Sequence, residues 1–520
     1  MTTSRICKIL VSTVLVSCAA IGCAQAALVI SSNATKNVAC SAGVCTATAK
    51  FAVMNAGDLT SMLASSDVTL VSGSEAKDIE SKVAFSWASA HRLTLDAYRS
   101  IAFDKLVTVA GTGALTLTTN DGGAGGTLSF APAGRVVFWD LSSSLVINGS
   151  SYALVGDIAT LAADIASNPS GRYALANNYD ATPDGTYTTS PIGLLYGTFE
   201  GLGNKIFKLT IIIAHKNQSV NLGFFSGLGT NSVVENLSLT SVKIVNGAER
   251  WNGILTPVNG GLIARVHVGG RVVTGFASIT GGLVGSNSGT ILSSDSVGFV
   301  QSKNASMLGG LVGIQWSGQI SGSHSTADVS ELTVPGSGFL DQTYIGGLVG
   351  RLRGSLDQSW ASGTVQVGSR NGSAPFVGGL VGYLDPYVDA PGSVSRCYAT
   401  GAVTGGDGTF VGGLVGVKNG PLEDSYSTGA VVGGAGGGVG GLLGADEGQA
   451  NADDYWDLDT SGVSDPSQGA GSPANDPGIT GLTDAQLKSG LPAGFDPAIW
   501  AQSPAINGGY PYLIANPPQH

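Results

Sequence analysis

Four aspartates near the C-terminus form a dense group of side chains that could do chemistry: Asp453, Asp454, Asp457 and Asp459. Paired carboxylates can cleave glycosides as acid and base, and a larger set of carboxylate oxygens can hold Ca²⁺. No spacing here matches a known calcium loop, and Trp456 lies inside the group. The sequence therefore favours a solvated acidic turn beside a buried tryptophan, while calcium binding and carboxylate catalysis stay open.

Five histidines are the other candidates for acid–base chemistry: His91, His215, His267, His324 and His520. None stands in a motif with a nucleophile and a carboxylate, and no nucleophile elbow supports a Ser-His-Asp triad. His324 shares its repeat position with aromatic residues, so we expect it to pack rather than to bind a metal. We therefore predict no catalytic residue, no cofactor and no metal site.

The cysteines are typical of an oxidising compartment. Cys40 and Cys45 bracket a four-residue loop, which favours a local disulfide. A zinc site is the competing interpretation, but no further ligand lies nearby. Cys397 stands at a repeat position otherwise held by serine, and we expect it to be buried as a packing residue.

Residues 1–26 have the form of a signal peptide. Two basic residues precede an apolar run, and Ala24-Gln25-Ala26 follows as a cleavage site. The run is too short for a transmembrane anchor. Because Leu15-Val16-Ser17-Cys18 resembles a bacterial lipobox, a lipid anchor at Cys18 is an alternative to free secretion.

The composition predicts strands and turns. Glycine supplies 79 of 520 residues, hydrophobic residues reach 43% and charged residues only 12%, a balance that favours β-structure with neutral polar outer faces. The net charge is −11, and Lys and Arg do not cluster. Nucleic acid and anionic membrane surfaces are therefore excluded as expected partners.

A repeat dominates the second half of the chain. Gly-Gly-Leu-Val-Gly begins at five positions, with variants at two more: Gly281, Gly309, Gly346, Gly378 and Gly412, then Gly260 and Gly440. Spacings of 21 to 37 residues indicate an array in which each unit buries its apolar face on its neighbours. We expect the glycines to allow positive φ at corners and close approach between coils.

A second element recurs after most copies and aligns residues into columns. One column holds His324, Trp360, Tyr398 and Tyr426, and the column before it holds Ser323, Ser359, Cys397 and Ser425. Members of a column should stack at the strand spacing of about 4.8 Å. We also expect Leu348 and Leu414 in the core and Asp357 on the surface.

This repeat resembles the GLUG motif of large secreted bacterial proteins of the filamentous-haemagglutinin and adhesin type. Gly223-Phe-Phe-Ser226 looks like a degenerate opening of the series, and the flanks at Tyr196–Ile206 and Tyr455–Gly462 are similar to that family's flanks. The resemblance implies an all-β fold, a right-handed parallel β-helix (β-solenoid), on the outer surface of a Gram-negative bacterium or secreted from it. It implies adhesion but supplies no catalytic residues.

The remaining segments complete the expected domain plan. Residues 27–145 alternate with period two and predict a β-rich N-terminal region. Residues 146–190 form a connector with a helix over 157–167, capped by Asp157, followed by the solenoid at 191–445. Residues 446–520 form a small cap, with a helix near 484–489 after the capping box at Thr483.

Three functions follow from this plan. The first is a non-enzymatic, adhesin-like protein that binds a glycan or a host or neighbouring cell-surface protein along its repeats. The second is a carbohydrate-active β-helix enzyme, a polysaccharide lyase or hydrolase. The third is a structural cell-surface protein.

Overall fold

The computed structural model describes residues 26–213, 220–247, 250–276, 278–303, 306–332, 342–369, 374–385, 392–448 and 451–518. The predicted signal peptide as far as Gln25, with Cys18, lies outside these ranges, as do His215 and His520. Within them the chain is all-β, and its strands pair almost entirely in parallel. The helices are α1 (Ala56–Leu63), α2 (Gly73–Ala76), α3 (Ile158–Ser167), α4 (Asp484–Leu487) and the 3₁₀ turns η1 (Thr182–Asp184) and η2 (Asn507–Gly509).

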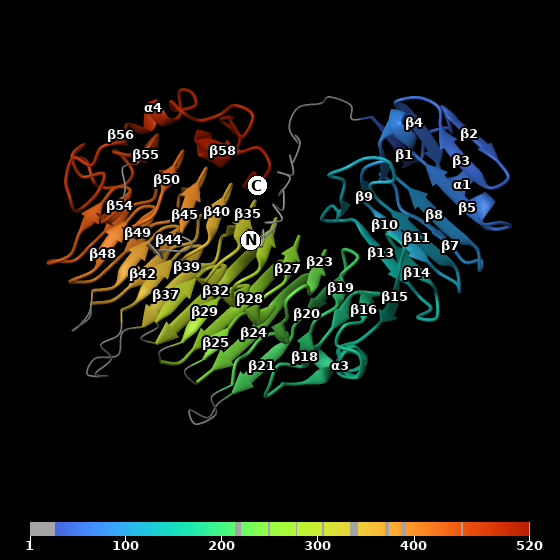
Figure 1. Cartoon of the computed structure of the whole chain (residues 1–520), viewed down its shortest axis with the longest axis horizontal. Helices are drawn as coiled ribbons and strands as arrows, with labels where there is room; N and C mark the ends of the chain where they lie inside the picture. Colours follow the sequence, from blue (N-terminus) through green and yellow to red (C-terminus); the bar gives the residue numbers. More distant parts are fainter. Residues whose placement is uncertain are drawn as a thin grey trace, which may run out of the picture.

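Two stacks of coils meet at a bend (Figure 1). One sheet runs through both stacks and is called the β2 sheet. Its order is β2 (Val38–Ser41), β3 (Val44–Ala47), β5 (Val68–Val71), β8 (Arg92–Asp96), β11 (Ala114–Thr118), β14 (Leu145–Ile147), β15 (Ser150–Val155), β16 (Arg172–Leu175), β19 (Thr198–Glu200), β23 (Val233–Glu235), β27 (Leu262–Ala264), β31 (Thr290–Leu292), β35 (Gln319–Ser321), β40 (Ser355–Asp357), β45 (Ser393–Ser395) and β50 (Leu422–Glu423).

Two further sheets complete the N-terminal stack, which the sequence predicted only as a β-rich region. The first is β4 (Phe51–Asn55), β1 (Ala27–Ser31), β6 (Asp78–Ser81), β9 (Ile101–Phe103) and β12 (Leu128–Phe130). The second is β7 (Phe85–Trp87), β10 (Leu106–Val109) and β13 (Arg135–Phe138). The hairpin β2–β3 begins the β2 sheet, and the predicted Cys40–Cys45 disulfide joins its two strands.

The β2 sheet serves two hydrophobic cores, one on each face at the bend. In β16, Tyr173 and Leu175 belong to the core of the repeat stack, whereas Ala174, and Ala176 just after the strand, belong to the core of the N-terminal stack. The antiparallel pair β14–β15 marks the change, because every later strand of this sheet runs opposite to β14. The two stacks therefore share strands rather than a linker.

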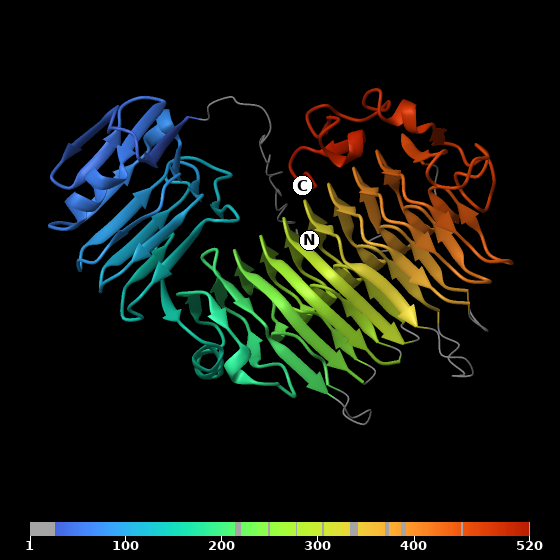
Figure 2. The same cartoon turned by 180° about the vertical axis from the view of Figure 1, so that it is seen from behind.

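Three more sheets enclose the repeat stack (Figure 2). The β17 sheet runs β17 (Tyr179–Asp180), β20 (Lys205–Phe207), β24 (Ser238–Asn246), β28 (His267–Thr274), β32 (Asp295–Lys303), β36 (His324–Ser325), β41 (Trp360–Ala361), β46 (Tyr398–Ala399), β51 (Tyr426–Ser427), β55 (Asp454–Asp457) and β56 (Ile479–Leu482). Off this path lie β21 (Thr210–Ile213), β37 (Asp328–Leu332), β42 (Val365–Val367), β47 (Val403–Thr404) and β52 (Val431–Val432).

The remaining two sheets carry the glycine-rich motif. The β18 sheet runs β18 (Ile192–Leu195), β22 (Phe225–Leu228), β26 (Thr256–Asn259), β30 (Val284–Asn287), β34 (Val312–Gln315), β39 (Val349–Leu352), β44 (Val381–Leu384), β49 (Val415–Lys418) and β54 (Leu443–Asp446). The β25 sheet runs β25 (Trp251–Asn252), β29 (Ile279–Gly281), β33 (Met307–Gly309), β38 (Tyr344–Gly346), β43 (Phe376–Gly378), β48 (Phe410–Gly412) and β53 (Val439–Gly440). From β22 to β54 the chain visits the β18, β2, β17 and β25 sheets in turn, which is the winding of a parallel β-helix.

The motif falls in one register, with one correction. Gly281 pairs with Gly309, and Leu283, Leu311, Leu348, Leu380 and Leu414 are all fully buried in the core. The variant at Gly260 is wrong as a copy, because it leads into β27, which pairs with β31 rather than with β30. The true preceding copy is Gly253-Ile254-Leu255-Thr256, since Thr256 pairs with Val284.

The motif glycines are required by close approach and not by positive φ. A Cβ added to Gly347 would lie 2.1 Å from the carbonyl oxygen of Gly379 in the next coil, and one added to Gly346 would lie 2.1 Å from the carbonyl oxygen of Val349. Neither glycine has a positive φ, so that part of the expectation is wrong. Residues with positive φ do form a column, at the corner before the serine column, and most are not glycine: Ser293, Gly322, Gln358, Arg396, Asp424 and Asp453.

The serine column is a hydrogen-bonded ladder along the core. The backbone N–H of Ser323 donates to Ser359 Oγ at 3.1 Å, and Ser359 Oγ donates to the carbonyl of Asp357 at 2.8 Å. A hydroxyl can both accept and donate, so it satisfies two backbone groups at each coil. Cys397 takes the same place, with Ser425 Oγ accepting from its N–H at 3.1 Å, and it is buried as expected.

The C-terminal segment folds back along the outside of the repeat stack. It contains α4 and the hairpin β57 (Trp500–Gln502) and β58 (Pro511–Leu513), and it lies beside β55 and β56 (Figure 1). Its side chains cover the aromatic column of the β17 sheet. Trp360, Tyr398 and Tyr426 form a cluster with Phe495 and Trp500. The helices predicted at 157–167 and near 484–489 are both present, and Asp157 and Thr483 cap them as expected.

Candidate binding surface

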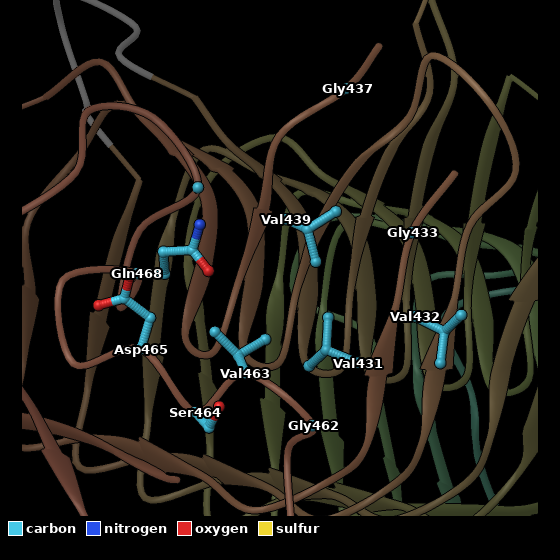
Figure 3. A pocket seen from close by; sticks show the side chains of 11 residues that line it. Val431, Val432, Gly433, Gly437, Val439, Gly462, Val463, Ser464, Asp465 and Gln468 are labelled. Atoms are coloured by element: carbon cyan, nitrogen blue, oxygen red, sulfur yellow. The ribbon is translucent and has the colours of Figure 1, made fainter. Parts of the chain in front are cut away.

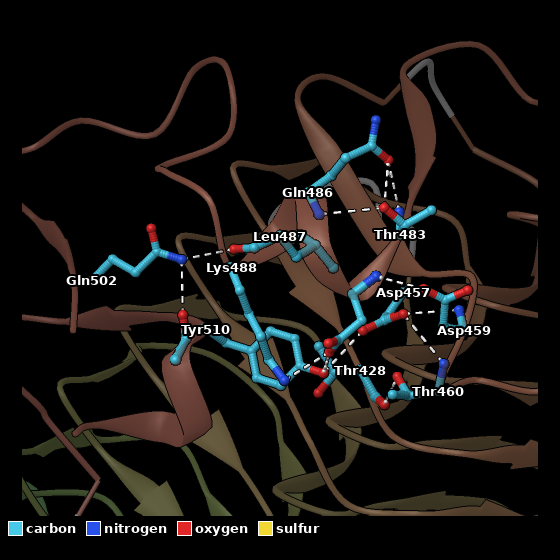
Figure 4. A network of polar contacts seen from close by, with 12 residues as sticks. Thr428, Asp457, Asp459, Thr460, Thr483, Gln486, Leu487, Lys488, Gln502 and Tyr510 are labelled. Atoms are coloured by element: carbon cyan, nitrogen blue, oxygen red, sulfur yellow. Dashed lines mark hydrogen bonds and ion pairs between the residues drawn. The ribbon is translucent and has the colours of Figure 1, made fainter. Parts of the chain in front are cut away.

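The four predicted aspartates do not converge on one point. Asp454 lies in the core at the end of the serine ladder, where its Oδ1 accepts from Ser425 N–H at 3.0 Å. Asp457 faces the C-terminal segment, and its Oδ2 accepts from Tyr510 O–H at 3.0 Å (Figure 4). Asp459 Oδ2 instead accepts a hydrogen bond from the backbone N–H of Asp484 at 2.9 Å. These carboxylates hold turns together, and in the described ranges no group of three or more His, Cys, Asp or Glu could hold a metal.

The acidic turn is also less solvated than the sequence suggests. Asp454 and Asp457 are both fully buried, because β55 is covered by the core on one side and by the C-terminal segment on the other. Burial raises the pKa of Asp454 well above its usual value. The neighbouring Trp456 is fully buried, as expected.

The described histidines have different surroundings. His91 Nδ1 lies 3.2 Å from Asp67 at the surface. His324 stacks on Trp360 with ring centroids 4.3 Å apart and planes 8° apart, as predicted for a packing residue. His267 Nδ1 lies 2.6 Å from Asp295 Oδ2, a pair that sequence analysis missed. Extending the aromatic column upstream would have found it, because His267, Asp295 and His324 are register partners.

A cavity of about 540 Å³ lies at the end of the repeat stack (Figure 3). Its walls include Val431, Val439 and Val463, together with the polar side chains of Asp465 and Gln468. Asp465 is its one titratable lining residue, and hydrogen bonds from Ser467 lower the pKa of that carboxyl. A lone ionised carboxylate lacks the partner that acid–base catalysis needs.

Apolar side chains line the outside of the β25 sheet over six coils. They are the first residues of successive strands and are register partners: Trp251, Ile279, Met307, Tyr344, Phe376 and Phe410. We call this set the outer stripe. Trp251 is exposed and the others are half-buried. Strand alternation produces the stripe, because the next residue of each strand points inward.

Aromatic and charged side chains broaden the stripe at its centre. Tyr383, on the neighbouring β18 sheet, stacks on Tyr344 with centroids 5.1 Å apart and meets Phe376 edge-on at 5.4 Å. The guanidinium of Arg351 lies 5.2 Å from the Tyr344 ring centre. Both tyrosine hydroxyls stay neutral, since burial raises the pKa of Tyr344 and raises that of Tyr383 to about 12.

A second arginine links this centre to an exposed tryptophan. Arg353 lies over the ring of Trp316 at 4.6 Å, and Trp316 is 37% exposed. Arg351 and Arg353 both donate to Asp385, at 2.7 and 2.5 Å, so three charges leave a net charge of +1. The arrangement joins ring faces to fixed hydrogen-bond donors, which suits binding rather than bond cleavage.

No family model matches the chain, and no curated protein matches it. One similar solved structure is described as a putative immunoglobulin A1 protease from Bacteroides ovatus, with 15% identity, a TM-score of 0.33, and coverage of 70% of this chain and 92% of that one. A likeness at this TM-score carries no argument about activity. In the described part of the chain no helix is long and apolar enough to cross a membrane.

Proposed function

We propose that this protein is an exported, non-enzymatic binding protein of the adhesin type, which engages a glycan through the outer stripe. We also propose that the chain belongs with the GLUG-motif repeat proteins and that its β-helix is right-handed. One observation carries the binding proposal: Tyr344, Phe376 and Tyr383 form a ring cluster on the outside of the stack, with Arg351 beside it.

The chemistry of this cluster favours a glycan. Sugar rings present apolar C–H faces that pack on aromatic side chains, while their hydroxyls need donors and acceptors in fixed positions. Arg351 supplies donors at the edge of the rings, and the buried carboxylate of Asp385 holds its guanidinium in place. A linear glycan lying along the stack would meet a new stripe residue about every 4.8 Å, so weak contacts would add by avidity.

The titratable side chains of the repeats support binding over catalysis. His267 and Asp295 form a pair on the outer face of the β17 sheet, and neither lines the cavity at Val431. Catalysis by acid and base needs groups that converge around a substrate. The side chains of the outer stripe therefore suit binding of a ligand and not its chemical conversion.

The experiment is a retention assay with residues 27–520 immobilised on beads and a panel of purified polysaccharides. Tyr344→Ala/Phe376→Ala should reduce retention about tenfold or more, since each lost ring contact is worth about 1 kcal/mol. Gln366→Ala/Glu423→Ala changes two exposed residues away from the stripe and should leave retention unchanged. Equal retention by both variants, or depolymerisation of any polysaccharide by the wild-type protein, would contradict the proposal.

A deletion tests the contribution of the repeats. Removing residues 346–411 takes out two coils and joins Ile345 to Gly412, a register partner of the lost Gly378. The shortened stack should fold, because the column that the C-terminal segment covers would continue from His324 to Tyr426, and it should retain less polysaccharide. Undiminished retention would place binding outside these coils.

A further inference from the structure

Two carboxylates lie side by side where the N-terminal stack meets the repeat stack. Glu200 in β19 and Glu235 in β23 are register partners in the β2 sheet. Glu200 is 1% exposed, whereas the side chain of Glu235 is 26% exposed. Their neighbour in the same row of the sheet is Ala174, which belongs to the core of the N-terminal stack. Glu200 therefore lies on the face of the sheet that the N-terminal stack covers.

The hydrogen bonds of Glu200 fix a turn. Its Oε1 accepts from Leu202 N–H at 2.7 Å, and its Oε2 accepts from Asn236 Nδ2 at 3.0 Å. Leu202 has a φ of 53°, which is unfavourable for a branched side chain and needs support from its surroundings. Glu200 gives that support.

The same turn is where the N-terminal stack attaches. The N–H of Val136 in β13 donates to the carbonyl of Leu202 at 3.0 Å, and the N–H of Phe138 donates to the carbonyl of Ala176 at 3.0 Å. A Cβ added to Gly203 would lie 2.5 Å from the carbonyl oxygen of Gly134, so the backbones are in direct contact. These contacts form the joint between the two stacks.

One cation serves both carboxylates. The Arg265 guanidinium forms an ion pair with Glu235, and its Nε donates to Asn236 Oδ1 at 2.8 Å. It reaches Glu200 only through that amide. The other titratable groups that act on this site are Tyr152 of β15, whose pKa is raised to about 12, and Arg172 of β16. Burial and the charge of Glu235 raise the pKa of Glu200 to about 8.

We propose that ionisation of Glu200 opens the joint between the two stacks, so that the bend is a pH-sensitive hinge. Protonated, Glu200 is a neutral group in a buried contact and supports the turn at Leu202. Ionised, it places a second negative charge beside Glu235, and the single Arg265 cannot neutralise both. Opening the joint hydrates the charge, so rising pH favours the open state.

Hydrogen exchange of the amides of Val136 and Phe138 tests this directly, because their hydrogen bonds cross the joint. From pH ~5 to ~9, after correction for intrinsic exchange, their protection should fall by up to about tenfold per pH unit as the pH rises toward the pKa of Glu200 in the closed joint, about 8, and should level off above it. Protection of Leu115, whose N–H donates to Ser144 within the N-terminal stack at 2.9 Å, should stay constant. Small-angle scattering over the same range should show a change in maximum dimension.

Two variants assign the effect to Glu200. Glu200→Gln should abolish the pH dependence at Val136 and Phe138, and the exposed control Glu423→Gln should preserve it. Glu235→Gln should move the transition to lower pH, because removing the neighbouring charge lowers the pKa of Glu200. If Glu200→Gln does not fold, the Glu235→Gln variant tests the proposal instead, through the direction in which its pH transition shifts. A wild-type joint without pH dependence, a transition that persists in Glu200→Gln, or an unmoved transition in Glu235→Gln overturns the proposal.

Discussion

Trp360 donates its indole N–H to the carbonyl oxygen of Asn516 at 2.9 Å, across 156 residues of sequence. The side chain of Asn516 continues the contact, with Nδ2 donating to the carbonyls of Ser323 at 3.1 Å and Gln358 at 3.2 Å. One residue near the end of the described chain therefore bridges two coils of the repeat stack. The C-terminal segment acts as a lateral clamp on coils that otherwise contact only their neighbours.

Asn516→Ala should lower the free energy of unfolding by about 1–3 kcal/mol, because two carbonyl groups lose their shared donor within a buried contact. Chemical denaturation followed by tryptophan fluorescence measures this, since Trp360 and Trp500 lie in the clamped cluster. The exposed Asn33→Ala should change stability by less than about 0.5 kcal/mol. Equal stability of the two variants would show that the clamp contributes nothing.

Leu348→Asp should destabilise the repeat stack by about 4 kcal/mol or more, since it buries an unpaired carboxylate in a fully enclosed position. Thermal melting monitored by circular dichroism reports the loss. Asp357, expected on the surface, is half-buried and bonded to Arg396 Nε at 2.7 Å, so it is not a neutral control. Gln366→Asp is the matched control, because Gln366 is exposed on β42. Similar melting temperatures would contradict the assigned facing.

Gly347→Ala should cost about 1–3 kcal/mol, because the new methyl group would collide with the carbonyl of Gly379 and force two coils apart. Gly193→Ala introduces the same methyl group where nothing lies within 4 Å, and it should be neutral or slightly stabilising. Denaturant midpoints of the two variants give the comparison. A neutral Gly347→Ala would show that coil spacing does not depend on the motif glycines.

Asp454→Asn should stabilise the protein at neutral pH and reduce its pH dependence. The folded state raises the pKa of Asp454, so its contribution to stability is fully present below the unfolded value, near 4, and is lost as pH rises toward the folded value. Its Oδ2 is buried with no hydrogen-bond partner, so a neutral side chain of the same shape loses no hydrogen bond there and removes the cost of burying the charge. Unfolding free energies measured at several pH values above ~4 test the slope. An unchanged slope would mean that Asp454 does not titrate with folding.

The predictable part of the fold was set by repetition. Recurring Leu348, Leu380 and Leu414 mark the core, and the column from His324 to Tyr426 marks one outer sheet, because each coil repeats the same environment. The copy assigned at Gly260 was wrong, since Gly-Gly also occurs in the turn between β26 and β27, and composition alone does not distinguish that turn from the motif. The true copy at Gly253 has lost two glycines and the valine, so its spacing was the available signal.

The site was less predictable because it depends on outward positions that the repeat does not constrain. Tyr344, Phe376 and Phe410 each precede a motif copy by two residues, but their neighbour Tyr383 comes from another sheet. The joint at Glu200 was hidden for a different reason. It forms where two unlike stacks meet, and neither the N-terminal coils nor the first repeat coils carry a shared sequence pattern.

The exchange of cores across β16 has a geometric consequence for the whole molecule. At the β14–β15 hairpin the strands of the β2 sheet reverse direction, while the successive coils continue to advance the same way along the sheet. Reversal alone would turn the winding into its mirror image. Moving the core to the opposite face is a second mirror operation, and the two cancel. Both stacks are therefore wound with the same hand. Strands of the same natural twist suit both stacks, so one hairpin can join two β-helices of matching chirality.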